Sequence, residues 1–218
     1  MGTWARAIWL SMFVASLALS SWADEKKLPI AEKAGSSTPK AKAAPPQPST
    51  LAELVTQLKD PAVAKRRMAA QQLGARGVRS MEAVPALIEA LGDPEPAVRA
   101  SVAEAIGGIG ITAKSAVPAL LKSLKDPDPL VRETAAEALS DIGADAPKII
   151  PALVELLNDE DMNVRCAGAR AIGDFRAAAR DAVPALQQLQ KQDKHPLVRE
   201  AAAEALQIIQ KAMQRLDS

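Results

Sequence analysis

The stretch that decides the fold is residues 126–158, which read DPDPLVRETAAEALSDIGADAPKIIPALVELLN. Between Val131 and Leu139, apolar residues recur at intervals of three and four, which places them on one face of an α-helix. Asp128 suits the N-cap of that helix, and Gly143 suits its end because glycine tolerates a positive φ. A second apolar run closes the stretch, which therefore predicts two amphipathic helices.

This pair of helices belongs to a tandem repeat with a period of 33 residues and one spacing of 34. A single pair of amphipathic helices cannot bury its apolar faces, so the core must form by stacking of successive units. We expect the proline of each unit to lie in or near the first turn of its second helix. The recurring markers are the prolines Pro85, Pro118, Pro151 and Pro184, the Val-Arg arginines Arg99, Arg132, Arg165 and Arg199, the aspartates Asp60, Asp93, Asp126 and Asp159, and the small residues Gly74, Gly107, Ser140 and Gly173.

The ends of the chain fit the same scheme. Residues 51–59 align with a second helix, and Thr50 with Glu53 predicts a capping box at its start. A long closing helix follows His195. The resulting organisation is an all-α domain at 51–218, made of a half repeat 51–59, repeats 60–92, 93–125, 126–158 and 159–192, and a capping half repeat 193–218.

The repeat resembles a known family. The pattern D-P-x-P-x-V-R-x-x-A-A-x-A-L-G, followed by A-V-P-A-L, is similar to the short bacterial HEAT repeat, also known as the bilin-lyase HEAT-like repeat. The resemblance covers residues 51–218 and implies an armadillo-like α-solenoid, a right-handed superhelix of about five helical hairpins. It also implies that second helices line the concave side and that this side binds proteins. It says little about activity, because similar repeats serve unrelated functions.

The variable positions of the second helices are the candidate binding residues, and they flank leucines that stay constant from repeat to repeat. Such variation fits a groove adapted to one protein partner, and it fits a merely solvated face equally well. The first row is Thr56, Glu89, Lys122, Glu155 and Gln188, and the second row is Lys59, Gly92, Lys125, Asn158 and Lys191.

Arginines and aspartates recur in register at the loop before each first helix. In a stack, each arginine can donate to the acidic loop groups of its own unit or of the adjacent one. We predict a structural charge ladder, and the alternative is a stripe that binds anions. Its members are Arg66, Arg99, Arg132, Arg165 and Arg199 with Asp60, Asp93, Asp126, Asp159 and Asp193.

Composition excludes several classes of chemistry. The chain has one His, one Cys and no Tyr, and its net charge is only +1, so we expect no multi-histidine metal site and no nucleic-acid partner. Cys166 lies in a register that predicts a solvent-facing thiol, and His195 is expected to be a loop or capping residue. We therefore assign no catalytic, cofactor-binding or metal-binding residue. The one basic cluster is Lys65, Arg66, Arg67, Arg76 and Arg79, read as a solvated face or as a contact with an anionic surface.

The N-terminus predicts an export signal. In residues 1–23, Arg6 precedes an apolar run and small residues that end at Ala23, as in a secretory signal peptide cleaved after that residue. The alternative is an uncleaved anchor, although the run is shorter than the roughly 20 residues that span a bilayer. Residues 24–50 are rich in Pro, Ala, Lys and Ser, and this composition predicts a disordered linker. Two roles are open for it: a spacer that holds the folded part away from a membrane or wall, or a disordered leader with no spacing role.

These inferences predict a periplasmic or secreted, monomeric, non-catalytic scaffold that binds another protein through its concave face, with membrane contact only through an uncleaved N-terminal segment. One alternative is an accessory subunit or degenerate relative of HEAT-repeat enzymes, either bilin lyases or deoxyhypusine-hydroxylase-like oxidoreductases, without an intact catalytic site. The resemblance implies His-Glu pairs for such a hydroxylase, and this chain has none. A further alternative is a surface-associated protein that uses the basic first unit.

Overall fold

The computed structural model describes residues 50–216, and the statements below concern that part of the chain. The predicted signal peptide at 1–23 and nearly all of the predicted linker at 24–50 lie outside the described residues. Within residues 50–216 every regular element is a helix. None of these helices has the length and apolarity that crossing a bilayer requires.

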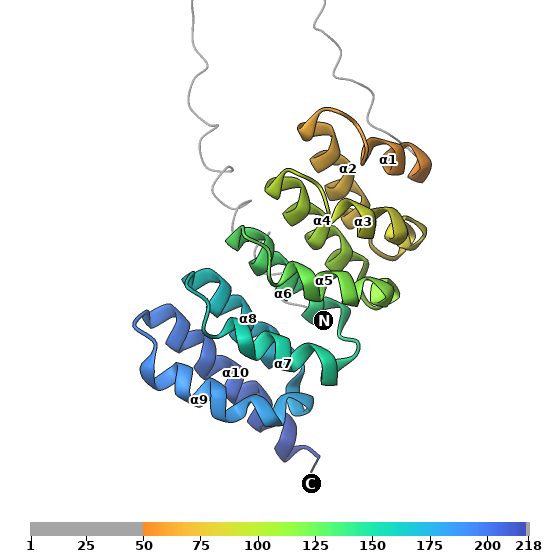
Figure 1. The fold of residues 1–218 in the computed structure, drawn as a ribbon. Coiled ribbons are helices and arrows are strands. Elements are labelled where there is room, and N and C mark those ends of the chain that lie inside the picture. Colours follow the sequence, from red (N-terminus) through yellow and green to blue (C-terminus); the bar gives the residue numbers. More distant parts are fainter. Residues whose placement is uncertain (1–49, 217–218) are drawn as a thin grey trace, which may run out of the picture. The chain divides into compact units, whose positions relative to one another are not determined.

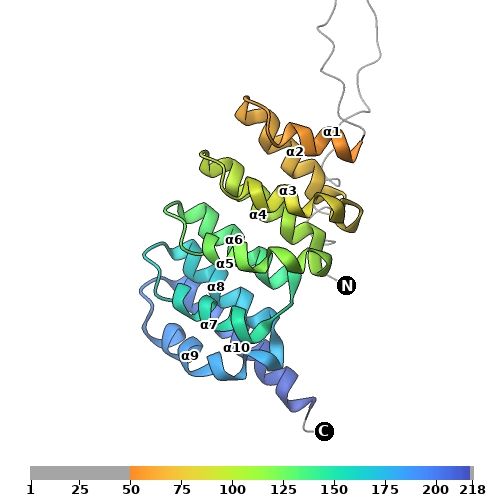
Figure 2. The ribbon, with the colours of Figure 1, turned by 45° about the vertical axis from the view of Figure 1, so that its right-hand side comes forward.

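The helices form pairs that stack in chain order, from α1 and α2 at one end to α9 and α10 at the other (Figure 1). A second view shows the same succession (Figure 2). Each first helix packs against the second helix that precedes it in the chain and against the first helices of the neighbouring repeats. The first helices are α2 (Val63–Ala75), α4 (Pro96–Ile109), α6 (Pro129–Ile142), α8 (Met162–Asp174) and α10 (Pro196–Gln214); the second helices are α1 (Leu51–Gln57), α3 (Val84–Ala90), α5 (Val117–Ser123), α7 (Ala146–Leu156) and α9 (Val183–Gln192).

Local sequence signals start and stop the helices as predicted at several places. The Asp128 side chain accepts a hydrogen bond from the Leu130 backbone N–H at the start of α6. Gly143 ends the same helix in the left-handed region, at φ 62°. Thr50 and Glu53 form the expected capping box on α1. These contacts satisfy backbone groups that a helix end leaves without partners.

The second helices differ from the prediction in one respect. Three of them follow a 3₁₀ helix, at η2 (Gly77–Ala83), η3 (Gly110–Ala116) and η4 (Arg176–Ala182), none of which the repeat pattern predicted. Helix α7 instead begins directly after Asp145, which adopts a left-handed conformation at φ 53°. Because α7 starts early, Pro151 lies inside the helix, and its predicted place in or near the first turn is wrong.

The core is a continuous row of buried apolar side chains along the stack. Each second helix contributes one leucine that is fully inaccessible to solvent. The first helices approach closely at the small residues of the repeat: a Cβ built on Gly74 would lie 2.8 Å from the Ala105 Cα. The same contact recurs where Gly107 meets Ala138 and where Gly173 meets Ala205.

The two ends of the stack depart from this pattern. In the repeat register, Gln72 of α2 stands where Ala105 stands in α4, and Gln207 of α10 stands where Gly74 and Gly107 stand. A further repeat at either end would place a long side chain in a contact that elsewhere holds glycine, serine or alanine. The glutamines therefore close the array, as terminal repeats with a polar outer face do in other repeat proteins.

Candidate functional site

The nine residues predicted to form the binding face are all exposed. They lie on the second helices or directly after them, in two rows that run along the stack. We refer to this surface, with Gly92 included, as the second-helix face. The nine side chains are those of Thr56, Lys59, Glu89, Lys122, Lys125, Glu155, Asn158, Gln188 and Lys191.

The two rows are joined by ion pairs that run from one repeat to the next. Lys59 Nζ lies 2.9 Å from Glu89 Oε2, and Lys125 Nζ lies 3.6 Å from Glu155 Oε2. Both pairs link the second row of one repeat to the first row of the following repeat. All four side chains are more than 60% exposed, so these pairs contribute little to stability and chiefly set the charge pattern of the face.

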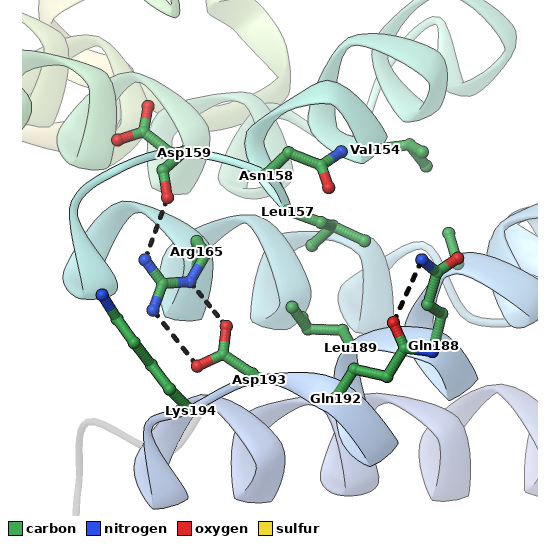
Figure 3. Close-up of a pocket in the computed structure, with 11 residues that line it drawn as sticks. Val154, Leu157, Asn158, Asp159, Arg165, Gln188, Leu189, Gln192, Asp193 and Lys194 are labelled. Atoms are coloured by element: carbon green, nitrogen blue, oxygen red, sulfur yellow. Dashed lines mark hydrogen bonds and ion pairs between the residues drawn. The ribbon is translucent and has the colours of Figure 1, made fainter.

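A groove of about 390 Å³ opens between α7 and α9 on this face (Figure 3). Its lining combines apolar side chains, among them Leu157 and Leu189, with polar and charged ones. On one side, Gln188 Nε2 donates to Gln192 Oε1 at 3.4 Å, and on the other lies an Arg165–Asp193 ion pair. A lining of apolar side chains together with a few polar groups suits the contact of a peptide or another protein.

A groove of about 370 Å³ occupies the corresponding place between α1 and α3. Lys59, Glu89 and Gly92 line it on the second-helix face, and Arg66 and Asp93 line it on the loop side. The recurrence of the groove at the same repeat position shows that it arises from the spacing of neighbouring second helices.

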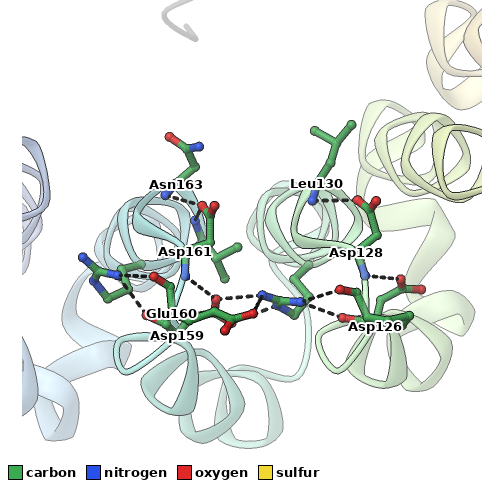
Figure 4. Close-up of polar contacts among 11 residues, drawn as sticks. Asp126, Asp128, Leu130, Asp159, Glu160, Asp161 and Asn163 are labelled. Carbon is green, nitrogen blue, oxygen red and sulfur yellow. Dashed lines mark hydrogen bonds and ion pairs between the residues drawn. The ribbon is translucent and has the colours of Figure 1, made fainter.

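The loops between repeats carry a ladder of buried ion pairs (Figure 4). At one junction, Arg132 Nε and Nη2 donate to the two carboxylate oxygens of Asp159, each at 2.8 Å. Arg132 Nη1 donates to the carbonyl oxygens of Asp126 and Pro127, at 2.8 and 3.2 Å. The same bidentate contact joins Arg66 to Asp93, Arg99 to Asp126 and Arg165 to Asp193.

The ladder ends where the repeats end. Arg199 donates to the carbonyl oxygens of Asp193 and Lys194, and among the described residues no following aspartate meets it. Asp60, at the other end, accepts from Lys65 Nζ and from the Ala62 backbone N–H. Between these ends, protein acceptors occupy the guanidinium groups on both edges. This geometry gives the arginines a structural role and leaves little room for an external anion.

The ladder sets the ionisation of its aspartates. Burial on its own would raise the pKa of Asp126. The hydrogen bonds from Arg99, the Asp128 backbone N–H and the charges of Arg99 and Arg132 outweigh burial and hold that pKa below its usual range. Asp93, Asp159 and Asp193 have lowered pKa values from the same balance of causes. Each therefore stabilises the fold as the charged form.

A second group of acids, which the sequence did not single out, lies on the first helices. Burial raises the pKa of Glu137, and the charges of Glu133 and Asp141 add to this effect. Burial is also the main cause of the raised pKa values of Glu133, Asp141 and Asp174. Among residues 50–216, no group of three or more His, Cys, Asp or Glu side chains is placed to hold a metal ion.

The structure corrects the prediction for the single cysteine. Cys166 is only 8% exposed, not solvent-facing, and burial raises the pKa of its thiol. In the same register Ala100 is also buried, Glu133 is half-buried, and Glu200 on the last helix of the stack is exposed. His195 is the N-cap residue of α10, although its side chain makes no capping hydrogen bond.

The basic cluster of the first repeat is divided in the fold. Lys65 and Arg67 lie near the start of α2, whereas Arg76 and Arg79 follow its last residue. Their separation along the helix is about 15 Å. Arg66 lies in the ladder, against Asp93. The five cations therefore do not form one compact patch.

Stacked amphipathic helix pairs, a continuous core and rows of variable exposed side chains define an α-helical repeat protein, an all-α solenoid. A family model described as HEAT repeats matches residues 51–139, 108–161 and 150–216, so the chain belongs to the HEAT repeat family. Comparison with curated proteins gave no match.

Several solved structures share the fold. The complex of CpcE and CpcF of phycocyanin lyase from Nostoc sp. PCC7120 matches at 29% identity and a TM-score of 0.66, over 82% of this chain and 71% of that chain. An engineered protein matches at 25% identity and a TM-score of 0.60, over 74% and 80%. A designed armadillo repeat protein in complex with the peptide (KR)4 matches at 22% identity and a TM-score of 0.59, over 73% and 81%, which shows the fold alone.

Proposed function

We propose that this protein is an exported, non-catalytic scaffold that binds another protein through its second-helix face. The observation that carries the proposal is the arrangement of that face. Nine exposed residues of varied type lie along a row of fully buried leucines, and grooves open between neighbouring second helices. A repeat array that keeps its core constant and varies one surface is suited to recognising an extended partner.

The comparison with the phycocyanin lyase complex supports a protein partner, because that structure contains two associated proteins, CpcE and CpcF. The same likeness favours a second candidate function, an accessory subunit of a lyase. This candidate predicts that the protein purified from its native cell carries a bound pigment. A colourless preparation with its binding partner attached would remove it.

Binding by the second-helix face is tested by recovering the full-length protein from its native cell with its partner. We expect a variant with Glu89→Lys, Lys122→Glu and Glu155→Lys to lose that partner. A matched control is Glu104→Lys, Arg170→Glu and Glu204→Lys, which makes the same charge changes at exposed positions on the first helices. Equal recovery of the partner with both variants would refute the proposed face.

Export is a separate part of the proposal and has its own test. Mass spectrometry of protein from the periplasm or culture medium is expected to give an N-terminus at Asp24. A chain that retains residues 1–23 would show that the segment remains as an anchor, and protein confined to the cytoplasm would refute export.

A further inference from the structure

The charge pattern of the second-helix face has one open position. Where the second row of one repeat meets the first row of the next, two junctions hold closed Lys–Glu pairs and one holds the neutral residues Asn158 and Gln188. At the remaining junction, Gly92 meets Lys122. Lys122 makes no ion pair or hydrogen bond with any of residues 50–216, although its neighbours on both sides are paired.

Gly92 has no side chain to pair with this lysine, and its position has room for one. It lines the groove between α1 and α3, and a Cβ built on it would meet only the Glu89 carbonyl oxygen, at an ordinary distance of 3.4 Å. Its φ is not positive, so the backbone does not require glycine here. The closed pairs show that a carboxylate from this place can reach a first-row lysine, because the Lys59–Glu89 pair spans the same junction with the charges exchanged.

The other unpaired cation of the two rows is Lys191, in the last turn of α9, one of the two helices that form the groove between α7 and α9. Among the described residues, the two unpaired charges of the second-helix face, on Lys122 and Lys191, are therefore both positive. Lys122 and Lys191 stand two repeats apart, and with neighbouring helix axes about 8–10 Å apart this is about 16–20 Å. An extended chain covers that distance in about six residues.

We propose that the second-helix face binds an extended acidic segment of its partner, with one carboxylate beside Gly92 on Lys122 and another, about six residues away, on Lys191. The inference rests on the proposed function, because it names the chemistry of what this face binds. The groove between α7 and α9 would hold intervening residues against a lining that includes Leu157 and Leu189, beside the neutral amides of Gln188 and Gln192. Charge complementarity of this kind sets the choice of partner and the rate of association.

The test uses the full-length protein and a dye-labelled oligoglutamate peptide of about ten residues, long enough to span both lysines. Binding is followed by fluorescence anisotropy at low ionic strength, with oligolysine of the same length for comparison. The decisive variant is Gly92→Glu, which supplies an internal carboxylate to Lys122. Its matched control is Gly92→Ala, which fills the same backbone position without charge. Arg67→Gln removes one exposed cation away from the face and controls for net charge.

We expect Gly92→Glu to weaken oligoglutamate binding at least about five-fold and Lys122→Gln to weaken it about three- to five-fold, the range for an exposed ion pair. Gly92→Ala and Arg67→Gln are expected to stay within about two-fold of the unmodified protein, since neither touches the open position. Unchanged binding by Gly92→Glu, tighter binding of oligolysine, or no oligoglutamate binding at all would overturn the inference.

These outcomes separate the inference from the proposed function. If oligoglutamate fails to bind while the triple charge reversal still releases the native partner, the face binds a protein of different chemistry. If the native partner stays bound to the triple variant, the proposed face itself is wrong, whatever the peptide does.

Discussion

Removing the Asp159 carboxylate should destabilise the fold by about 3 kcal/mol. Asp159 receives two hydrogen bonds from Arg132 at 2.8 Å and one from the Asp161 backbone N–H at 2.9 Å. The side chains of the pair are only 10% and 11% exposed. Asp159→Ala would therefore leave a guanidinium edge and a backbone N–H without acceptors. We take the lower end of the range for a broken buried pair because Arg132 keeps its two carbonyl acceptors.

Glu160 provides a matched control one residue away. Its carboxylate also approaches Arg132, at 3.9 Å, but its side chain is 91% exposed. Glu160→Ala removes the same charge and should change stability by less than about 0.5 kcal/mol. Both variants remove one negative charge, so the difference between their losses of stability measures the effect of burial and bidentate geometry.

Urea unfolding followed by far-ultraviolet circular dichroism is the suitable assay, because residues 50–216 contain no Trp or Tyr to report by fluorescence. The slope of the transition must be compared between variants, since repeat arrays can unfold in parts. A loss for Asp159→Ala that is within about 1 kcal/mol of the loss for Glu160→Ala would refute the view that the ladder holds adjacent repeats together.

Four further predictions concern buried side chains and close helix contacts of the fold. Ser80→Ala should raise stability by about 1 kcal/mol in the same assay, because the Ser80 hydroxyl is fully buried and has no hydrogen-bond partner; a loss of stability would show that a partner exists. Gly74→Ala should lower the melting temperature despite the better helix propensity of alanine, because its Cβ would lie 2.8 Å from the Ala105 Cα, and an increase would contradict that close contact. Stability should fall steeply below about pH 4, because the ladder aspartates have lower pKa values in the folded protein than in the unfolded chain. Their contribution to stability is complete above the unfolded-state pKa and is lost as the pH falls through the folded-state pKa. Melting temperatures that stay constant down to about pH 3 would contradict this. Cys166 should react slowly with a thiol reagent in the native protein and rapidly in urea, and equal rates would contradict its burial.

Much of the fold could be predicted because the repeat shows each structural signal several times. The N-cap at Asp128 and the helix end at Gly143 depend on side-chain and backbone chemistry that is local to a few residues. The 3₁₀ helices recur at the repeat spacing, but the sequence pattern did not predict them because periodicity does not distinguish one short 3₁₀ segment from a turn or a helix end. The early start of α7 follows from the left-handed conformation of Asp145, which the repeat pattern does not reveal.

The site was predictable only in outline. The period placed the exposed rows correctly in sequence, but the ion pairs of the second-helix face join residues 30 positions apart rather than 33. That offset depends on how one helix lies across the next, which is a tertiary property. The burial of Cys166 was missed for a similar reason, since the exposure of this register differs between repeats, from buried at Ala100 to exposed at Glu200 on the last helix.

The ladder uses the same atoms at every internal junction, and the glutamines Gln72 and Gln207 mark only the two outer surfaces. Duplication of an internal unit such as residues 93–125 would thus create a new junction whose arginine, aspartate, glycine and alanine already match. A single unequal recombination event within the gene could lengthen the array without any compensating substitution. Such an event would change the length of the array and leave its internal contacts as they are, so natural variants that differ by whole units would fit partners of different size.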